Sequence, residues 1–356
     1  MTAALGFIPL RHEGKLTGLA AFGQPILTEK IASHFSVDEA GRLHSDFASY
    51  PQMERFIHTL AAQVSREDAS ASIQKMFEDK LLLSIRRLLQ RHKSPRLGVA
   101  GGAFANVRLN RMLAENLPIE QIFIFPAMGD EGMPAGGGLC YLLQRDGLRH
   151  WLSQRRDLRD VYLGRDYTDS IDAVLGVTTG IRKTAEPPIE GAARRLTAGQ
   201  LGAIYTGRME YGPRALGARS ILANPSRRET HDLLNKRLAR SEFMPFAPVI
   251  AADKASTVFD INEVNSYACR FMTITCNVKP QWRERIAAVV HIDGSARPQT
   301  IEPRPIRFIT TFWPLLSAKA AFPFWSIPAS TFTKSRSSTN PPNVSRRWRM
   351  GGSTLW

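Results

Sequence analysis

The chain has 356 residues, more than a single hydrophobic core usually serves, so we expect two domains. Its hydrophobic content of 43% and charged content of 22% are those of a soluble globular protein and exclude a fibrous or disordered chain. The first residues lack a charged segment followed by a long apolar core, so no signal peptide is expected. Cys140, Cys269 and Cys276 form no CxxC pair and are too few for a disulfide framework. They are expected to be packing residues of a protein in the reducing cytoplasm.

The net charge of +15 is unevenly distributed along the chain. After Glu302 the sequence contains eight Lys or Arg residues and no Asp or Glu, so this end supplies more than half of the excess. It also holds four of the six tryptophans and shows no helical or strand period. Residues 304–356 are therefore predicted to be a basic tail that differs in kind from the body of the protein.

Apolar residues between Glu67 and Gln90 recur at helical spacing and predict a long amphipathic helix with a structural role. Leu97–Ala100 is predicted to be a short buried strand that runs into the pair Gly101–Gly102, and a helix should follow from about Asn106 to Glu115. A strand, a double glycine and a helix in this order present helix amides to a phosphate. The alternative is that the two glycines only permit close packing.

A second strand is predicted over 121–125, ending in the turn Pro126–Gly132. A helix rich in small residues should follow, through Cys140 to Leu143. Asp130 in this turn is a candidate metal ligand, because a carboxylate at a strand end suits a hard or borderline metal. The alternative is that Asp130 caps the following helix.

Residues 164–190 are loosely patterned and predict a linker over 163–188. A helix from Ile189 and a strand over 201–205 should then lead into residues 207–220, which we call the arginine loop. A helix over Thr230–Leu238 and a strand over Phe246–Ile250 complete the predicted α/β sheet.

The arginine loop is the most informative stretch of the sequence. Three glycines and one proline restrict its backbone path, and Arg208, Arg214 and Arg219 lie within twelve residues. Guanidinium groups bind phosphate or carboxylate oxygens bidentately, and glycine lets backbone amides approach the same ligand. The alternative is a surface turn with solvated arginines.

Several ordered motifs between residue 5 and about residue 303 resemble the O-carbamoyltransferase family, which includes nodulation-type and antibiotic-tailoring enzymes. These motifs are His12–Gly23, Gly101–Asn106, Pro126–Gly132, Gly207–Ser220, Asn224–Pro225, Leu233–Arg237, Glu242–Pro248 and His291–Thr300. The resemblance implies the carboxyl-terminal part of an actin/Hsp70-like (Kae1-like) α/β domain at 1–162. An incomplete YrdC-like α/β domain is implied at 189–303.

In this family the YrdC-like domain is held to make carbamoyl-adenylate from carbamoyl phosphate and ATP. The Kae1-like domain is held to pass the carbamoyl group to an acceptor hydroxyl, with a divalent metal, iron or magnesium, in the intact site. By this resemblance Arg214, Arg219 and Arg297 are expected to be catalytic through neutralising phosphoryl charge, and Asp130 is expected to bind the metal. The candidate ligand-binding residues are Lys15 (in an expected loop), Gly101, Gly102, Asn106, Arg208, Ser220, Lys236 and Arg240. His291 and Asp293 are candidates for acid–base chemistry or for structural hydrogen bonding.

The chain departs from the family pattern at both ends. Family members hold the metal partly with an amino-terminal His-x-x-x-His pair, and no two of the eight histidines here are four residues apart. The expectation is a chain that begins inside the first domain and is completed by a separately encoded amino-terminal piece. Back-translation of residues 327–339 in a shifted frame resembles a family segment, which suggests a frameshift near residue 303. The alternatives for the tail are an RNA-binding arm and a membrane span over 306–329, against which Arg307, Lys319 and three prolines argue.

The predicted function is ATP-dependent O-carbamoyl transfer from carbamoyl phosphate to a hydroxyl of a sugar-containing acceptor, such as a nodulation factor. Neither a membrane nor a nucleic acid is an expected partner. One alternative is a non-catalytic remnant of such an enzyme. The other is an RNA-binding protein related to tRNA-modification factors, suggested by the positive charge.

Overall fold

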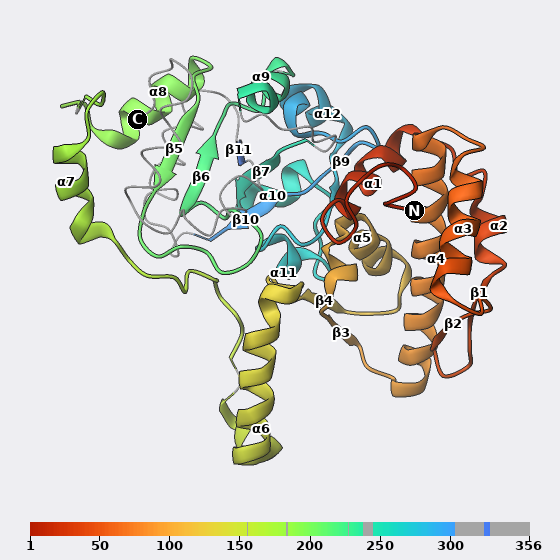
Figure 1. The fold of residues 1–356 in the computed structure, drawn as a ribbon. Coiled ribbons are helices and arrows are strands. Elements are labelled where there is room, and N and C mark those ends of the chain that lie inside the picture. Colours follow the sequence, from red (N-terminus) through yellow and green to blue (C-terminus); the bar gives the residue numbers. More distant parts are fainter. Residues whose placement is uncertain (155, 183, 227, 238–244, 303–323, 328–356) are drawn as a thin grey trace.

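The computed structural model describes residues 1–154, 156–182, 184–226, 228–237, 245–302 and 324–327 (Figure 1). Helices and strands both occur throughout these residues, so the α/β class is confirmed at this level. Within them, no helix is long and apolar enough to cross a membrane.

The amino-terminal part is a helical layer built around the long helix α4 (Arg66–His92), which confirms the predicted amphipathic helix. The Ser65 side chain caps α4 by accepting a hydrogen bond from the Asp68 N–H at 3.0 Å. Several helices pack against α4, and a short antiparallel strand pair lies beside it (Figure 1). These elements are α1 (Glu13–Leu19), α2 (Thr28–Ala32), α3 (Tyr50–Ala61), β1 (Phe35–Val37) and β2 (Leu43–Ser45).

Lys15 lies within α1, so the expectation of a loop at this position is wrong. The helix forms because it buries Leu16 and Leu19 against the layer that α4 organises. The two glycines that suggested a loop are tolerated inside it.

The predicted strands of the first domain are β3 (Arg96–Val99) and β4 (Gln121–Ile124), which pair in parallel. The expectation that the first strand is buried is wrong, because the side chains of β3 are exposed or only partly buried. Parallel strands end at the same edge of a sheet, so the turns after them lie together. The Gly101 N–H donates to the Met128 carbonyl at 2.8 Å, which joins the double-glycine turn to the Pro126–Gly132 turn.

The helix predicted from about Asn106 to Glu115 is α5 (Val107–Asn116), and Asn106 caps it. A 3₁₀ helix over Gly102–Ala105 lies between the double glycine and α5. The phosphate-binding role of the two glycines stays a prediction.

The predicted small-residue helix is α6 (Met133–Gln154), and none of its residues is buried. Figure 1 shows α6 extending away from the other elements. A further helix, α7 (Thr168–Val177), lies in the predicted linker, where no helix was expected. Its apolar residues are spaced for a helix but lie within too short a stretch to be recognised.

The carboxyl-terminal part contains small sheets and short helices. Strands β5 (Gly202–Tyr205) and β6 (Arg219–Leu222) pair in antiparallel fashion, with the arginine loop as their connection. The remaining elements are α8 (Pro188–Thr197), α9 (Glu229–Arg237), β7 (Ala247–Ala251), α10 (Ala252–Val258), α11 (Ser266–Cys269), β8 (Cys276–Asn277), α12 (Pro280–Arg283), β9 (Ser295–Ala296), β10 (Gln299–Ile301) and β11 (Phe324–Ile327). Helices α8 and α9 and strands β5 and β7 were predicted from the sequence.

Strand β7 is the centre of a three-stranded sheet, with β10 parallel on one side and β11 antiparallel on the other. β11 belongs to the predicted basic tail, in which the sequence shows no strand period. Its backbone pairs with β7 over four residues. The rest of the tail lies outside the described residues.

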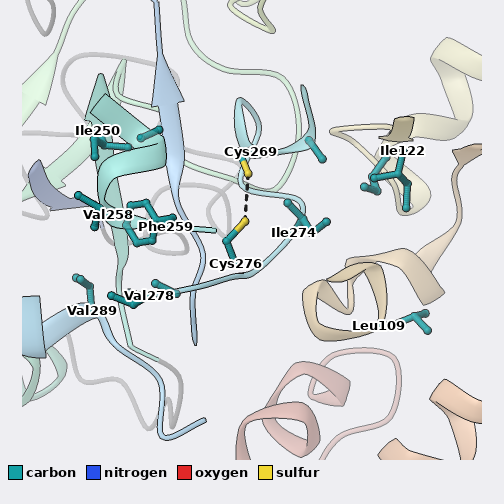
Figure 2. Close-up of a cluster of buried hydrophobic side chains, with 14 of the residues drawn as sticks. Leu109, Ile122, Ile250, Val258, Phe259, Cys269, Ile274, Cys276, Val278 and Val289 are labelled. Atoms are coloured by element: carbon teal, nitrogen blue, oxygen red, sulfur yellow. Dashed lines mark hydrogen bonds between the residues drawn. The ribbon is translucent and has the colours of Figure 1, made fainter. Parts of the chain in front are cut away.

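One hydrophobic cluster contains buried residues of both predicted domains (Figure 2). Leu109 and Ile122 come from the first, whereas Ile250, Cys269 and Cys276 come from the second. The two buried sulfur atoms are 3.4 Å apart and serve packing as expected, but Cys140 is exposed, so the packing prediction is wrong for that residue. The boundary over 163–188 stays a prediction, and the shared core means that the two parts depend on one another.

Leu109→Ala is expected to lower the free energy of unfolding by about 3 kcal/mol, since Leu109 is fully buried in the shared cluster and the truncation leaves a cavity. Urea unfolding followed by circular dichroism measures the loss. The control Leu152→Ala removes an exposed side chain of α6 and should change the free energy by less than about 1 kcal/mol. Equal losses for the two variants would contradict the shared core.

Candidate functional site

The arginine loop is held in shape by the carboxylate of Glu210, which is only 6% exposed. Its Oε1 accepts hydrogen bonds from the backbone N–H groups of Leu216 (2.8 Å), Ala218 (2.6 Å) and Arg219 (3.2 Å). Hydrogen bonds to a charged acceptor are stronger than neutral ones. The loop therefore folds back over a single buried carboxylate.

Arg219 complements Glu210 by binding carbonyl oxygens of the same loop. Its Nη1 donates to the carbonyls of Thr206 (2.7 Å) and Ala218 (2.8 Å), and its Nη2 donates to that of Gly207 (2.8 Å). The guanidinium also lies 3.6 Å from the centre of the Tyr205 ring. Arg219 is the first residue of β6 and 2% exposed, so we correct its expected role from phosphate binding to holding the loop.

Ser220 and Arg208 are also occupied by contacts within this part of the protein. Ser220 is fully buried, and its Oγ accepts a hydrogen bond from the Gly217 N–H at 2.9 Å, so it does not face a ligand as expected. Arg208 is exposed, and its Nε donates to the Gly164 carbonyl at 2.8 Å.

The middle of the arginine loop packs directly on the Pro126–Gly132 turn of the first domain. The Tyr211 hydroxyl donates to the Glu131 carbonyl at 2.6 Å, and the Tyr211 ring meets that of Phe125 edge to face. Gly212 has a φ of +113°, and a Cβ there would lie 3.1 Å from the Pro126 carbonyl oxygen. Glycine is therefore required at this point by both its backbone conformation and the close approach.

Arg214 follows this contact and reaches the other turn of the first domain. Its Nη2 lies 3.4 Å from the Ala105 carbonyl, while its Nε is shielded from solvent and has no hydrogen-bond partner among the described residues. Burial lowers the pKa of Arg214 to about 10, an effect that the nearby Glu131 opposes. A poorly solvated guanidinium without a paired carboxylate favours an anionic ligand.

The double-glycine segment next to Arg214 has free space around it. Gly101 has a φ of +111°, and a Cβ on either Gly101 or Gly102 would meet no atom within 4 Å. Asn106 is different, because its side chain caps α5 and hydrogen-bonds Gln74 at 2.8 Å. Asn106 thus positions the segment. Lys15, which lies in α1, has its Nζ 5.9 Å from the centre of the Phe7 ring.

The described residues do not assemble a metal site around Asp130. Asp130 is exposed, and no group of three or more His, Cys, Asp or Glu side chains with metal-binding geometry occurs in the described ranges. A single carboxylate binds a metal weakly, so Asp130 and the other described residues do not by themselves hold a metal.

Arg297 lies in a separate cluster with His291 and Asp293. The Ser295 hydroxyl donates to Asp293 Oδ1 at 2.6 Å and contacts His291 Nδ1 at 3.0 Å, and Arg111 of α5 pairs with Asp293 at 3.1 Å. Burial lowers the pKa of His291 to about 4. The negative charge of Asp293 opposes this shift, whereas the positive charges of Arg297 and Arg111 add to it. Lys236 is exposed on α9, and Arg240 lies outside the described residues.

Two family models match the chain: the carbamoyltransferase amino terminus over residues 1–139 and the carbamoyltransferase carboxyl terminus over residues 193–320. The second match continues beyond the break predicted near residue 303. Together they cover the double-glycine segment, the Pro126–Gly132 turn and the arginine loop. The chain belongs to the carbamoyltransferase family, which is a family of transferases.

Individual relatives agree with this assignment. An uncharacterized protein of Methanocaldococcus jannaschii is 32% identical over 321 residues, which is 85% of this chain and 50% of that protein. Nodulation protein U of Sinorhizobium fredii is 29% identical over 81% of this chain and 52% of its own length. Nodulation protein NolO of Bradyrhizobium diazoefficiens is 30% identical over 81% and 54%. The chain thus spans about half the length of the curated relatives that it matches.

Sequence reasoning missed Glu210 and Tyr211, which lie inside the arginine loop itself. A lone acidic residue among glycines and arginines indicates a carboxylate that receives loop amides, and an aromatic residue before a glycine indicates a contact. Neither residue type identifies its partner, because Glu210 and Tyr211 both hydrogen-bond backbone groups, which are the same in every residue.

Glu210→Ala is expected to lower the free energy of unfolding by about 3 kcal/mol, because three buried N–H groups lose their acceptor. Thermal and urea unfolding measure the change. Glu263→Ala, at an exposed position, serves as the control and should be nearly neutral. A neutral Glu210→Ala would show that this carboxylate does not organise the loop.

The stability of the protein is expected to fall as the pH drops from about 6.5 to about 4. In this interval the unfolded chain protonates His291 whereas the folded protein, with a pKa of about 4, does not. The loss should be about 2 kcal/mol, below the full value for such a shift because His291 is partly exposed. Urea unfolding at several pH values measures it.

The variant His291→Gln should remove this part of the pH dependence, and His58→Gln, at an exposed position, should retain it. An unchanged pH profile in His291→Gln would contradict the assignment.

Proposed function

We propose that the chain carries out ATP-dependent carbamoyl activation and O-carbamoyl transfer, with carbamoyl phosphate as the donor. The observation that carries the proposal is the position of Arg214, whose side chain bridges the arginine loop and the double-glycine turn and pairs with no carboxylate of the described residues. Both ATP and carbamoyl phosphate are anions that such a guanidinium stabilises.

The proposed activation consumes one carbamoyl phosphate, one ATP and one water, and yields carbamoyl-adenylate, phosphate and pyrophosphate. Water cleaves carbamoyl phosphate to carbamate and phosphate, and a carbamate oxygen then attacks the α-phosphorus of ATP with pyrophosphate as the leaving group. Negative charge on phosphoryl oxygens rises during this displacement, so the role proposed for Arg214 is electrostatic stabilisation. Glu210, Tyr211 and Arg219 would position the loop that carries it.

The space over Gly101 and Gly102 is proposed to admit phosphate oxygens next to Arg214. Arg297 is proposed to add positive charge from the His291 cluster, and Arg208, Lys236 and Arg240 remain proposed phosphate contacts. A metal completing the site through Asp130 would need ligands from outside the described residues.

The acceptor is proposed to be a hydroxyl on a sugar-containing molecule, because curated relatives include proteins named nodulation proteins U and NolO. The transfer step breaks the mixed anhydride bond between the carbamoyl group and the phosphate of the adenylate. The acceptor hydroxyl forms the new carbamate ester and loses its proton, and AMP is released.

Arg214→Gln is expected to lower the rate of carbamoyl-adenylate formation about 100-fold, since one electrostatic donor to the reacting phosphoryl group is lost. Incubation with ATP and carbamoyl phosphate, followed by chromatography of the adenylate and a pyrophosphate assay, measures the rate. Arg228→Gln, which removes an exposed arginine of the same domain, is the matched control and should retain activity.

A folded protein that forms neither adenylate nor pyrophosphate would identify the chain as a non-catalytic remnant. Formation at the full rate in Arg214→Gln would remove Arg214 from the mechanism while leaving the activity itself intact.

A further inference from the structure

A chain of polar side chains connects the long helix α4 with the end of the double-glycine segment, where α1 and α5 both pack against α4 or its neighbours (Figure 1). Its members are Glu78 and Gln74 of α4, Thr17 of α1 and Asn106, which caps α5. Glu78 and Gln74 are only 5% and 6% exposed. Polar groups at such depth are unfavourable without partners, so the hydrogen bonds among these side chains decide how each one is oriented.

Glu78 fixes the direction of the Gln74 amide. Its Oε1 lies 2.8 Å from Gln74 Nε2 and 2.9 Å from the Nε of Arg108, which belongs to α5. A carboxylate oxygen accepts hydrogen bonds and donates none, so the amide nitrogen of Gln74 must be the atom that faces Glu78. The amide oxygen of Gln74 is then directed toward Asn106.

Gln74 in turn fixes the direction of the Asn106 amide. Gln74 Oε1 accepts a hydrogen bond from Asn106 Nδ2 at 2.8 Å, and Gln74 Nε2 donates to Asn106 Oδ1 at 3.3 Å. Thr17 Oγ1 accepts from the same Asn106 nitrogen at 3.3 Å. Asn106 Oδ1 is therefore the atom that faces α5, where it accepts the Leu109 N–H at 3.0 Å. A reversed Asn106 amide would present its own N–H groups to that N–H, and the cap would be lost.

The peptide group that precedes the Asn106 side chain is the one that Arg214 contacts. The Ala105 carbonyl and the Asn106 N–H belong to the same planar peptide. The N–H donates to the Ala103 carbonyl at 3.3 Å, and the carbonyl oxygen lies 3.4 Å from Arg214 Nη2. If Asn106 turned, this peptide would turn with it and withdraw the carbonyl from the guanidinium.

We propose that Glu78 and Gln74 are positioning residues: through Asn106 they hold the peptide that keeps Arg214 in place. The inference rests on the proposed function, in which Arg214 stabilises the reacting phosphoryl group. Neither Glu78 nor Gln74 touches a ligand in this scheme. Their effect on the reaction passes entirely through Arg214, and this dependence makes the inference testable.

Gln74→Met keeps the length of the side chain but has no amide, so Asn106 loses the partner that orients it. The rate of carbamoyl-adenylate formation per folded chain should fall about tenfold, because the guanidinium is no longer aligned with the phosphoryl group. In the Arg214→Gln background the same substitution should have no further effect on the rate. A double-mutant cycle of the four rates measures this coupling, which a merely structural role of Gln74 would not produce.

Two control variants separate the orientation of the amides from the ion pair and from general damage. Lys75→Met changes the next residue of α4, which is exposed, and should leave the rate unchanged. Arg108→Gln removes the ion pair but leaves Glu78 to accept from Gln74, so its rate should stay within about twofold of the wild type.

Two further variants change the orientation at other points. Glu78→Leu removes the acceptor itself and should lower the rate as Gln74→Met does. If neither of these variants folds, Thr17→Val removes a weaker partner of the same Asn106 nitrogen. It should lower the rate about twofold, again only while Arg214 is present.

The outcomes distinguish the inference from the function on which it rests. An unchanged rate in folded Gln74→Met, or an equal loss with and without Arg214, overturns the positioning role and leaves the proposed activity intact. A folded wild-type protein that forms no adenylate overturns the proposed function. Hydrogen exchange followed by mass spectrometry then decides the positioning role: peptides over residues 101–110 should exchange faster in Gln74→Met than in Lys75→Met, and equal exchange would contradict it.

Discussion

The structure depends on Glu210 and Arg219, which satisfy the backbone hydrogen-bonding groups of a buried loop. A backbone segment that leaves regular structure in a protein interior must find partners for its N–H and carbonyl groups. Glu210 receives three N–H groups, and Arg219 donates to three carbonyls of the same connection. Arg219 belongs to both sets, since its own N–H donates to Glu210. Two buried charged side chains thus perform the task that strand pairing performs on either side.

Because Glu210 and Arg219 satisfy the backbone at the two ends of the loop, the middle of the loop is free to contact the other part of the protein. Tyr211 and Gly212 press on the Pro126–Gly132 turn, and Arg214 reaches the segment after the double glycine. The parallel pairing of β3 and β4 brings those two turns to one edge. Three segments that lie far apart in the sequence therefore meet, and the shared hydrophobic cluster holds them in register.

The different roles of Arg219 and Arg214 follow from the way each guanidinium is buried and hydrogen-bonded. The buried guanidinium of Arg219 donates to three carbonyl oxygens through its two Nη atoms, and only its Nε lacks a partner among the described residues. A guanidinium at the junction of two segments is left incompletely satisfied, which describes Arg214. The sequence pattern does not distinguish Arg214 from Arg219, because both are arginines of the same motif.

The sequence by itself determined the family, the α/β class and most of the helices and strands that frame the site. These follow from local properties: the apolar period of α4, the short apolar runs of β3 and β4, and glycines where the backbone must turn. It did not determine the helix around Lys15, the turn before α5, the helix α7 or the strand β11. Each of these depends on a neighbouring element or on a stretch too short to carry a period.

Only the tertiary structure decided which polar side chains remain open to a ligand. Arg219, Ser220 and Asn106 were candidates by residue type, but their hydrogen-bonding groups are taken up by backbone atoms and side chains brought near by folding. Arg214 differs from Arg219 because it makes a single contact of 3.4 Å, to the Ala105 carbonyl, whereas Arg219 donates to three carbonyls. Residue type sets what a side chain is able to bind, and the competition among nearby partners, which exists only in the folded chain, decides what it is left to bind.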